Sequence, residues 1–339
     1  MKTIVLEEPG KFTYTETIID EDLRSEEALV KVHRIGICGT DFHAYRGNQP
    51  FFTYPRILGH ELGVEVLKVG ENVTNVWVGD RCSVEPYVNL TQDQAVRQGH
   101  TNCGENLSVL GVHEDGGMRE RFKLPAQYLH KSEKLSYEQL AVIEPLGIGC
   151  HAVNRAKVQP DDLVLVVGAG PIGLAAVIFA TAQGAKTIVM DIHQERLRFA
   201  QKTTNIYGTV VAGQDDTIDQ LKAQFGGDLP TVVLDATGNQ HSMNKALEYS
   251  APAGRIAFIG LFQGDFSFHD PYFHKKELTL MASRNALASD FKQIIQMMET
   301  GQIDVSQWVT HHSSFEEMAG QFDNWLQPES QVIKAVVSV

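Results

Sequence analysis

Three side chains in the first half of the sequence could together bind a metal ion. They are Cys38 in the string CGTDFH, His60 in GHE, and Glu144 in EP. A thiolate, an imidazole and a carboxylate that meet at one point, with a fourth position open, are typical of catalytic zinc. Such a zinc acts as a Lewis acid and polarises a substrate oxygen. Taken singly, each residue has an ordinary alternative, since a lone Cys is usually core and a lone His usually a satisfied polar residue.

A second group of residues is suited to binding a dinucleotide. The string GAGPIG follows an apolar strand and opens a helix, so that its glycines permit a tight turn, close approach of a pyrophosphate and close packing of helix on strand. The pyrophosphate would lie at the helix N-terminus, near free N–H groups. An incidental glycine-rich turn is the structural alternative. The predicted cofactor-binding residues are Gly168, Gly170, Pro171, Ile172, Gly173, Asp191, Arg196 and Thr237.

Asp191 bears on which dinucleotide is used. It ends the second expected strand, where a carboxylate accepts hydrogen bonds from the ribose hydroxyls and repels a 2′-phosphate. No Arg or Lys occupies positions 192–195, and Arg196 is the first cation after Asp191. The sequence therefore predicts NAD in preference to NADP.

The pattern of apolar residues predicts two kinds of architecture. Residues 28–37, 63–70 and 80–88 read as strands cut by turns, which indicates a β-rich first part. From about residue 157, strands at 163–167, 187–191, 232–236, 255–260 and 278–283 alternate with helices. This alternation is typical of a parallel sheet covered by helices, an α/β fold. The last strand, 332–339, is expected to return to the first domain.

Composition excludes several classes of partner. The 339 residues carry a formal net charge of -13, which disfavours nucleic acid and anionic membrane surfaces. The uncharged stretch 163–182 resembles a membrane span by hydropathy, but it contains the strand, glycine turn and helix described above. Four cysteines and an N-terminus without a signal-peptide pattern favour a reducing, cytoplasmic setting.

The strings GICGTD, GHE, EP and GAGPIG together resemble the medium-chain zinc-dependent alcohol and polyol dehydrogenases over the whole chain. The resemblance implies a GroES-like β-rich catalytic domain over 1–150 and a Rossmann doubly wound parallel-sheet domain over 151–285. A return segment, 286–339, would complete the catalytic domain. It also implies a zinc-dependent, NAD-dependent enzyme that forms a homo-oligomer, a dimer or a tetramer.

Within that family, Cys38 and His60 match zinc ligands and Glu144 matches the third-ligand position of the polyol branch. Glu61 matches the carboxylate beside the metal, which can enter or leave the coordination sphere. Thr40 and His43 match a proton relay from the reacting alcohol to solvent. Asp41 matches a residue that orients a ligand.

A narrower resemblance concerns the substrate. The segments 47–56, 108–117, 235–244 and 273–286 resemble the sugar-acid members of the family, of the L-galactonate type. A sugar carboxylate that enters a site rich in Glu needs a cation. The predicted substrate residues are Arg56, Lys275, Arg284 and Asn285, with His274 and Lys276 beside them. A sorbitol-like polyol or L-threonine dehydrogenase, and a catalytically silent nucleotide-binding relative, are the alternatives.

One departure from the family pattern concerns a second metal. Members often hold a structural zinc through four closely spaced cysteines, but the corresponding positions here are Leu90, Asp93, Val96 and Cys103. A closed tetrahedral site cannot be built from this set, so the structural zinc is predicted to be absent. His100 is read as a surface residue, and the pair at 311–312 as a solvated region before a helix.

Overall fold

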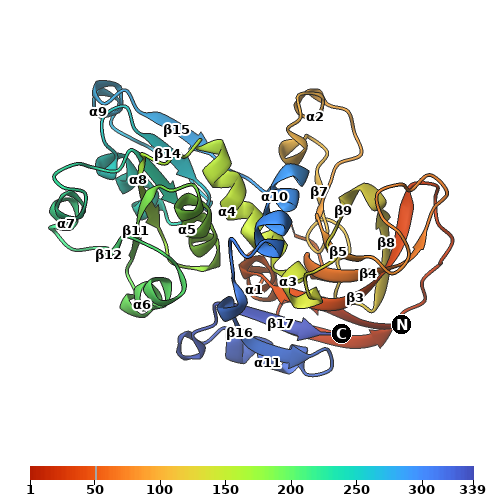
Figure 1. Ribbon diagram of the computed structural model, residues 1–339. Helices are drawn as coiled ribbons and strands as arrows, with labels where there is room; N and C mark the ends of the chain where they lie inside the picture. The colour runs from red at the N-terminus through yellow and green to blue at the C-terminus, as the bar shows by residue number, and fades with distance from the viewer. Residues whose placement is uncertain (50–51) are drawn as a thin grey trace. The chain divides into compact units, whose positions relative to one another are not determined.

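The computed structural model describes residues 1–49 and 52–339, so two residues of the 47–56 segment, 50 and 51, lie outside the described chain. It divides into two units: unit 1 comprises Met1–Pro145 with Ala286–Val339, and unit 2 comprises Leu146–Asn285. The domain boundary expected after residue 150 falls inside helix α4 (Ile143–Arg155). Each unit contains its own sheet (Figure 1).

Unit 1 is built around a seven-stranded sheet. Its order is β16-β17-β3-β4-β5-β9, and β8 also pairs with β3. The strands of this sheet are β3 (Glu27–Ile37), β4 (Glu61–Val69), β5 (Arg81–Val84), β8 (Arg121–Pro125), β9 (Leu129–Lys131), β16 (Val309–Ser314) and β17 (Lys334–Ser338). Strands β1 (Lys2–Glu8) with β2 (Lys11–Glu16), and β6 (Tyr87–Val88) with β7 (Ser108–Val109), form two small antiparallel pairs.

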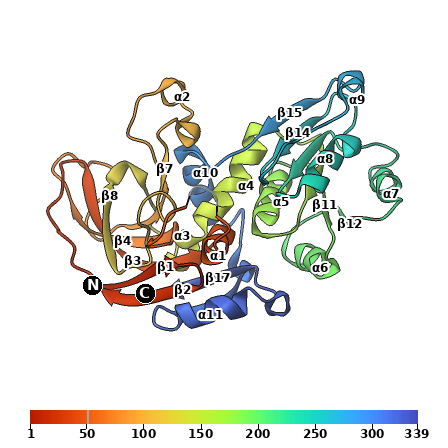
Figure 2. The same ribbon diagram turned by 180° about the vertical axis from the view of Figure 1, so that it is seen from behind.

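The C-terminal strand lies in the sheet of unit 1, where the sequence analysis expects it. β17 pairs antiparallel with β3, with Val336 opposite Gly36, and parallel with β16. Figures 1 and 2 show this blue segment beside the red N-terminal strands. Burial of apolar side chains explains the pairing, because Ala335, Val336 and Val337 are all fully buried.

Short helices connect or cover these strands. Unit 1 contains α1 (Gly39–Tyr45), α2 (Gln94–Arg97), α3 (Tyr137–Ala141), α10 (Ala288–Glu299) and α11 (Met318–Trp325), with 3₁₀ turns η1 (Thr101–Cys103), η2 (Ala126–Tyr128), η3 (Ser306–Trp308) and η4 (Pro328–Ser330). The pair at 311–312 does lie before a helix, α11, but the expectation that it belongs to a cap region is wrong. His311 and His312 lie in strand β16, and His312 Nε2 is 2.9 Å from Glu138 Oε2.

Unit 2 is a Rossmann fold. Its six strands are all parallel in the order β12-β11-β10-β13-β14-β15. They are β10 (Leu163–Val167), β11 (Lys186–Asp191), β12 (Gly208–Val211), β13 (Val232–Asp235), β14 (Arg255–Phe258) and β15 (Thr279–Ala282). The helices are α5 (Pro171–Ala182), α6 (Gln194–Thr203), α7 (Thr217–Gln224), α8 (Gln240–Tyr249) and α9 (Asp270–Lys275). The predicted α/β class is therefore confirmed.

The apolar stretch 163–182 is divided between β10 and α5. Both elements are almost wholly buried in unit 2, which explains their hydropathy without a lipid environment. Across the described residues, no helix combines the length and apolar character needed to cross a bilayer.

Candidate active site

Two paired strands and the turn between β3 and α1 bring together a thiol, an imidazole and a carboxylate. Within residues 1–49 and 52–339, one group of potential metal ligands is found, with donor atoms of Cys38, His60 and Glu61 all within 4.8 Å of one another. Cys38 follows β3 and caps α1, while Glu61 begins β4 directly opposite Gly36 of β3. A Cβ at position 36 would lie 2.1 Å from the Glu61 carboxylate, so glycine is required there.

Asp41 lies close to two residues of this group, Cys38 and His60. Its Oδ2 accepts a hydrogen bond from Cys38 N at 2.9 Å, and its Oδ1 lies 3.8 Å from His60 Nδ1. Burial by itself would lower the pKa of His60, but Asp41 and Cys38 outweigh it and raise the pKa well above its ordinary value. Burial raises the pKa of Asp41, with His60 opposing. Asp41 is thus placed to orient the imidazole, as the sequence predicts.

Glu144 lies in the first turn of α4 and is also buried. It stands outside the group of three, but its charge interacts with His60 and Glu61. Burial raises its pKa to about 7, partly opposed by His60. The hydroxyl of Tyr87 donates a hydrogen bond to Glu144 Oε1. Sequence reasoning missed Tyr87, because nothing local connects residues that are 57 positions apart.

Lys334 of β17 is the second residue that sequence reasoning missed. Its ammonium donates to both oxygens of Glu61, at 2.6 and 2.7 Å, and to Ile37 O at 3.1 Å. Burial would lower the pKa of Lys334, but Glu61 and Cys38 raise it above its ordinary value. A Lys in an apolar C-terminal strand gives no sign in the sequence that it reaches a metal-ligand group.

Thr40 and His43 lie on one face of α1, three residues apart. Thr40, two residues after the N-cap residue Cys38, is half-buried, whereas His43 is exposed. His43 is therefore the more solvent-accessible of the two side chains. A proton relay through Thr40 and His43 stays a prediction.

The residues present fit a zinc ion. Thiolate, imidazole and carboxylate are its preferred ligands, and a divalent cation would offset the negative charge of the buried acids. His60 Nδ1 is buried without a hydrogen-bond partner, which leaves its ring poorly satisfied by protein groups alone. Cys38, His60, Glu61 and Glu144 are therefore the residues that would hold the metal.

The glycine string in unit 2 has the geometry that a dinucleotide needs. Gly168 adopts φ +96° at the turn after β10, and a Cβ on Gly173 would lie 1.7 Å from Gly168 O. Nothing lies within 4 Å of a Cβ built on Gly170, the N-cap residue of α5, so the backbone can be approached there. Pro171 occupies the first turn of α5. This arrangement matches the three roles of the glycines.

A cavity of about 640 Å³ opens at this turn. It is lined by five of the predicted cofactor residues, Gly168, Gly170, Asp191, Arg196 and Thr237. Pro171, Ile172 and Gly173 are not among its lining residues and belong instead to the start of α5.

Asp191 both organises the glycine turn and faces the cavity. It accepts hydrogen bonds from Ala169 N at 2.7 Å and His193 N at 2.8 Å, one at each carboxylate oxygen. Each oxygen keeps a second lone pair for a ribose hydroxyl. Thr237 donates to the fully buried Asp235, whose ordering role sequence reasoning missed.

The predicted substrate residues have different surroundings. Arg56, in unit 1, pairs with Asp115 at 3.3 Å and donates to Thr53 at 2.9 Å. In unit 2, Lys275 and Arg284 are exposed, and Asn285 adopts φ +55°. Lys276 donates to Ser250 O at 2.5 Å and to two further carbonyls at the end of α8, so it is a helix cap.

The segment around residues 90–103 is held by hydrogen bonds. Asp93 caps α2 by accepting from Val96 N at 3.0 Å, and it also accepts from Glu105 N at 2.8 Å. Leu90 and Cys103 are exposed. Asp93 thus connects helix α2 with the chain at residue 105 by accepting hydrogen bonds from backbone N–H groups of both.

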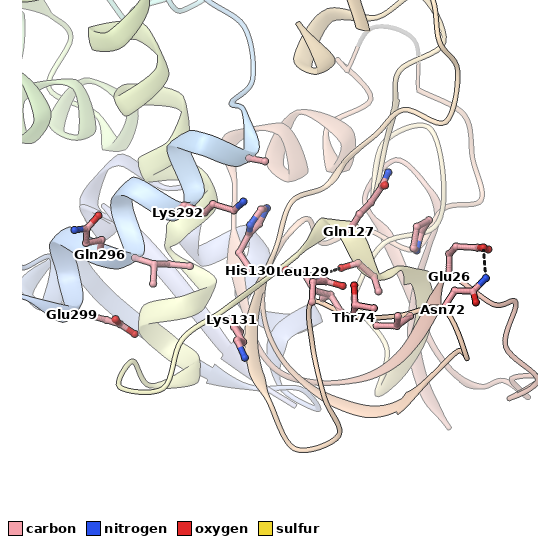
Figure 3. Close-up of a pocket in the computed structure, with 16 residues that line it drawn as sticks. Glu26, Asn72, Thr74, Gln127, Leu129, His130, Lys131, Lys292, Gln296 and Glu299 are labelled. Carbon is pink, nitrogen blue, oxygen red and sulfur yellow. Dashed lines mark hydrogen bonds between the residues drawn. The ribbon is translucent and has the colours of Figure 1, made fainter. Parts of the chain in front are cut away.

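A further cavity of about 690 Å³ lies beside α10 (Figure 3). Side chains of α10, including Lys292 and Glu299, form one wall, while β9 and residues 72–75 form another. His130 on β9 bonds the buried Glu85 at 2.7 Å and stacks on Phe291, with ring centroids 4.8 Å apart. None of the four candidate metal ligands lines this cavity.

Comparison with known proteins agrees with this geometry. The alcohol dehydrogenase GroES-like domain matches residues 24–134, and the zinc-binding dehydrogenase domain matches residues 171–300. The chain belongs to the zinc-type alcohol dehydrogenase family, and it is an enzyme of the dehydrogenase class. The resemblance stated from the sequence is confirmed.

Three individual proteins show which members of this family the chain is similar to. The chain is 40% identical over 338 residues to L-galactonate-5-dehydrogenase of Escherichia coli (strain K12), covering 100% of this chain and 99% of that protein. It is 30% identical to sorbitol dehydrogenase of Bacillus subtilis (strain 168), over 95% of this chain and 93% of that one. The RspB alcohol dehydrogenase of E. coli CFT073, crystallised with NADH, superposes with a TM-score of 0.92 at 30% identity, covering 100% and 99% of the two chains.

Proposed function

We propose that this enzyme uses zinc and NAD to oxidise a secondary hydroxyl of a sugar acid of the L-galactonate type. The group of Cys38, His60 and Glu61 supports the reaction class, because its donor atoms converge within 4.8 Å. The substrate class is supported by the 40% identity, over the full chain, to a protein that acts on L-galactonate.

The residues of unit 1 would have separate roles in the reaction. Cys38, His60 and a carboxylate would hold the zinc, which supplies Lewis-acid polarisation of the substrate oxygen when bound. Thr40 accepts the proton of the reacting hydroxyl and passes it towards His43, which is exposed and exchanges it with solvent. The carboxylate of Asp41, 3.8 Å from His60 Nδ1, favours this orientation of the ring by its charge.

The Rossmann unit would bind the dinucleotide, which supplies the hydride acceptor when bound. Gly168 and Gly170 at the N-terminus of α5 would hold its pyrophosphate, and the carboxylate of Asp191 would accept hydrogen bonds from the ribose hydroxyls. The carboxylate of Asp191 disfavours a 2′-phosphate, which makes NAD the preferred cofactor. A relative of the same fold was crystallised with NADH, which supports this assignment.

Arg284 and Lys275 are the proposed partners of the sugar carboxylate. Both cations are exposed in unit 2. Arg56, the third predicted cation, lies in unit 1, where Asp115 and Thr53 accept hydrogen bonds from its guanidinium. A guanidinium recognises a carboxylate through two parallel hydrogen bonds, which a neutral polyol does not provide.

A polyol dehydrogenase is the second candidate, supported by the similarity to sorbitol dehydrogenase. The deciding experiment is NADH formation by the zinc-loaded enzyme with L-galactonate, other aldonates, sorbitol and L-threonine. We expect the highest kcat/KM with an aldonate. Equal kcat/KM on sorbitol and aldonates would refute the sugar-acid assignment, and no turnover of any substrate would favour a silent nucleotide-binding relative.

Arg284→Gln sharpens this comparison. Loss of a charge-assisted contact should lower kcat/KM for the acid by about 30-fold or more, with little effect on a matched neutral polyol. Arg198→Gln, which removes an exposed arginine paired with Glu195 on α6, is the matched control. A dimer or tetramer and a cytoplasmic setting remain predictions from the sequence and the family resemblance.

A further inference from the structure

Lys334 uses all of its hydrogen-bonding capacity inside the protein. Its ammonium lies 2.6 and 2.7 Å from the two oxygens of Glu61 and 3.1 Å from Ile37 O. Lys334 is 4% exposed and Glu61 is 0% exposed. An ammonium has three protons to donate, and these three contacts account for them. The side chain is therefore fixed on Glu61.

The site offers four candidate ligands, three with donor atoms within 4.8 Å of one another and a fourth, Glu144, whose charge interacts with His60 and Glu61. This number poses a problem for catalysis. Cys38, His60, Glu61 and Glu144 could together fill a tetrahedral zinc. A zinc with four protein ligands is a closed, structural site, whereas a catalytic zinc keeps one position open for the substrate. One of the two carboxylates must therefore be kept from permanent coordination.

The contacts distinguish the two carboxylates. Glu61 faces a full positive charge that engages both of its oxygens, whereas Glu144 receives a neutral hydroxyl from Tyr87 on one oxygen. A cation at 2.6 Å competes with a metal for the same lone pairs and weakens the carboxylate as a ligand. A single phenol hydrogen bond leaves the other oxygen of Glu144 available.

We propose that Lys334 is a positioning residue that withholds Glu61 from permanent zinc coordination. This inference rests on the proposed function, in which the site holds zinc. The resting ligands are then Cys38, His60 and Glu144, and the fourth position stays open. Without Lys334, the uncompensated charge of Glu61 is drawn to the metal and closes the site.

The main test measures metal release and not activity alone. Zinc transfer to a chromogenic chelator is timed for wild type, Lys334→Met and Lys334→Arg, and the visible absorption of the cobalt-substituted proteins is recorded without substrate. We expect Lys334→Met to release zinc roughly tenfold more slowly, to change the cobalt spectrum and to lose turnover. Lys334→Arg keeps the charge and should behave like wild type. Equal or faster release from Lys334→Met overturns the proposal.

The double variant Lys334→Met/Glu61→Gln is the matched control. It removes both charges of the buried pair, so the wild-type release rate and spectrum should return. Persistence of the altered cobalt spectrum in the double variant would show a structural effect of position 334 and would also overturn the proposal.

A second pair of variants covers the case in which Lys334→Met does not fold. Glu61→Gln alone should keep zinc, with a release rate within about twofold of wild type, whereas Glu144→Gln should release it at least about tenfold faster. Equal acceleration in both variants contradicts the proposal. A wild-type protein that binds no zinc would overturn the proposed function itself, whereas zinc binding with the wrong ranking of variants overturns only the role of Lys334.

Discussion

The hydroxyl of Tyr87 donates a hydrogen bond to the carboxylate of Glu144, and both side chains are buried. Burial raises the pKa of Tyr87 well above its ordinary value, and the Glu144 charge adds to this effect, so the phenol remains a proton donor. This contact orients a candidate zinc ligand from a separate part of the chain.

Tyr87→Phe should therefore impair the site more than the fold. Removal of the hydroxyl frees Glu144 to rotate, and kcat/KM should fall roughly tenfold or more, with faster zinc loss. Tyr128→Phe is the control, because that buried hydroxyl bonds the backbone of Asn89, and its hydrogen-bond partners include none of the four candidate ligands. It should lower the melting temperature without changing zinc release, and equal kinetic effects in the two variants would exclude a specific role for Tyr87.

The cofactor preference can be tested at Asp191. Asp191→Ser combined with Ile192→Arg replaces the repelling carboxylate with a cation, so the ratio of kcat/KM for NADP over NAD should rise by at least about tenfold. Thermal melting must be recorded in parallel, because Asp191 also holds Ala169 N and His193 N. A wild-type enzyme that prefers NADP would show that the argument from Asp191 is wrong.

Thiol alkylation distinguishes the four cysteines by their surroundings. Cys103 is exposed, whereas Cys150 is buried and burial raises the pKa of Cys82 to about 12. In the zinc-loaded protein, iodoacetamide should modify Cys103 rapidly and leave the buried thiols intact. After removal of zinc with a chelator, Cys38 should become the second reactive thiol. Peptide mapping that finds Cys38 modified equally fast with and without zinc would argue against its role as a ligand.

Asp162 joins the starts of three strands in unit 2. It accepts from Gln159 N at 2.7 Å, from Thr231 Oγ1 at 2.7 Å and from Arg255 Nη2 at 2.5 Å. Burial would raise its pKa, but the hydrogen bonds from Thr231 and Gln159 and the contact with Arg255 lower it below the ordinary value. The carboxylate therefore stabilises the fold above its unfolded pKa, and this contribution is lost as the pH falls through the folded pKa.

Asp162→Asn should accordingly reduce the free energy of unfolding at pH 7 by about 1–3 kcal/mol. The difference from wild type should shrink in acid, as the wild-type carboxyl becomes protonated. Asp161→Asn, at the exposed neighbouring position, should change stability by less than about 0.5 kcal/mol. Urea unfolding at several pH values measures both, and a difference that grows in acid would contradict the assignment.

The parts of the site that the sequence predicts are those with local patterns. The strand, glycine turn and helix around Gly168 follow from consecutive residues, and Cys38 and His60 stand in short strings typical of one family. Lys334 and Tyr87 could not be predicted this way. Lys334 contacts Glu61 across 273 positions, and only strand pairing of β17 with β3 creates that contact.

The two histidines of β16 show a different limit. From the sequence, His311 and His312 are read as a solvated region before a helix, but strand pairing with β17 fixes 309–314 as extended chain. Asp93 shows the opposite case. By the family resemblance, Asp93 stands at a position where other members have a zinc-binding cysteine. In the structure, its side chain caps helix α2.

The most direct test of the whole account is the zinc content of the purified protein. Elemental analysis should find about one zinc per chain in wild type and in Cys103→Ala, and almost none in Cys38→Ala, because the site needs its anionic thiolate. Activity with NAD should disappear together with the metal. Two zinc ions per chain, or full zinc retention by Cys38→Ala, would contradict the account of a single zinc held beside Cys38.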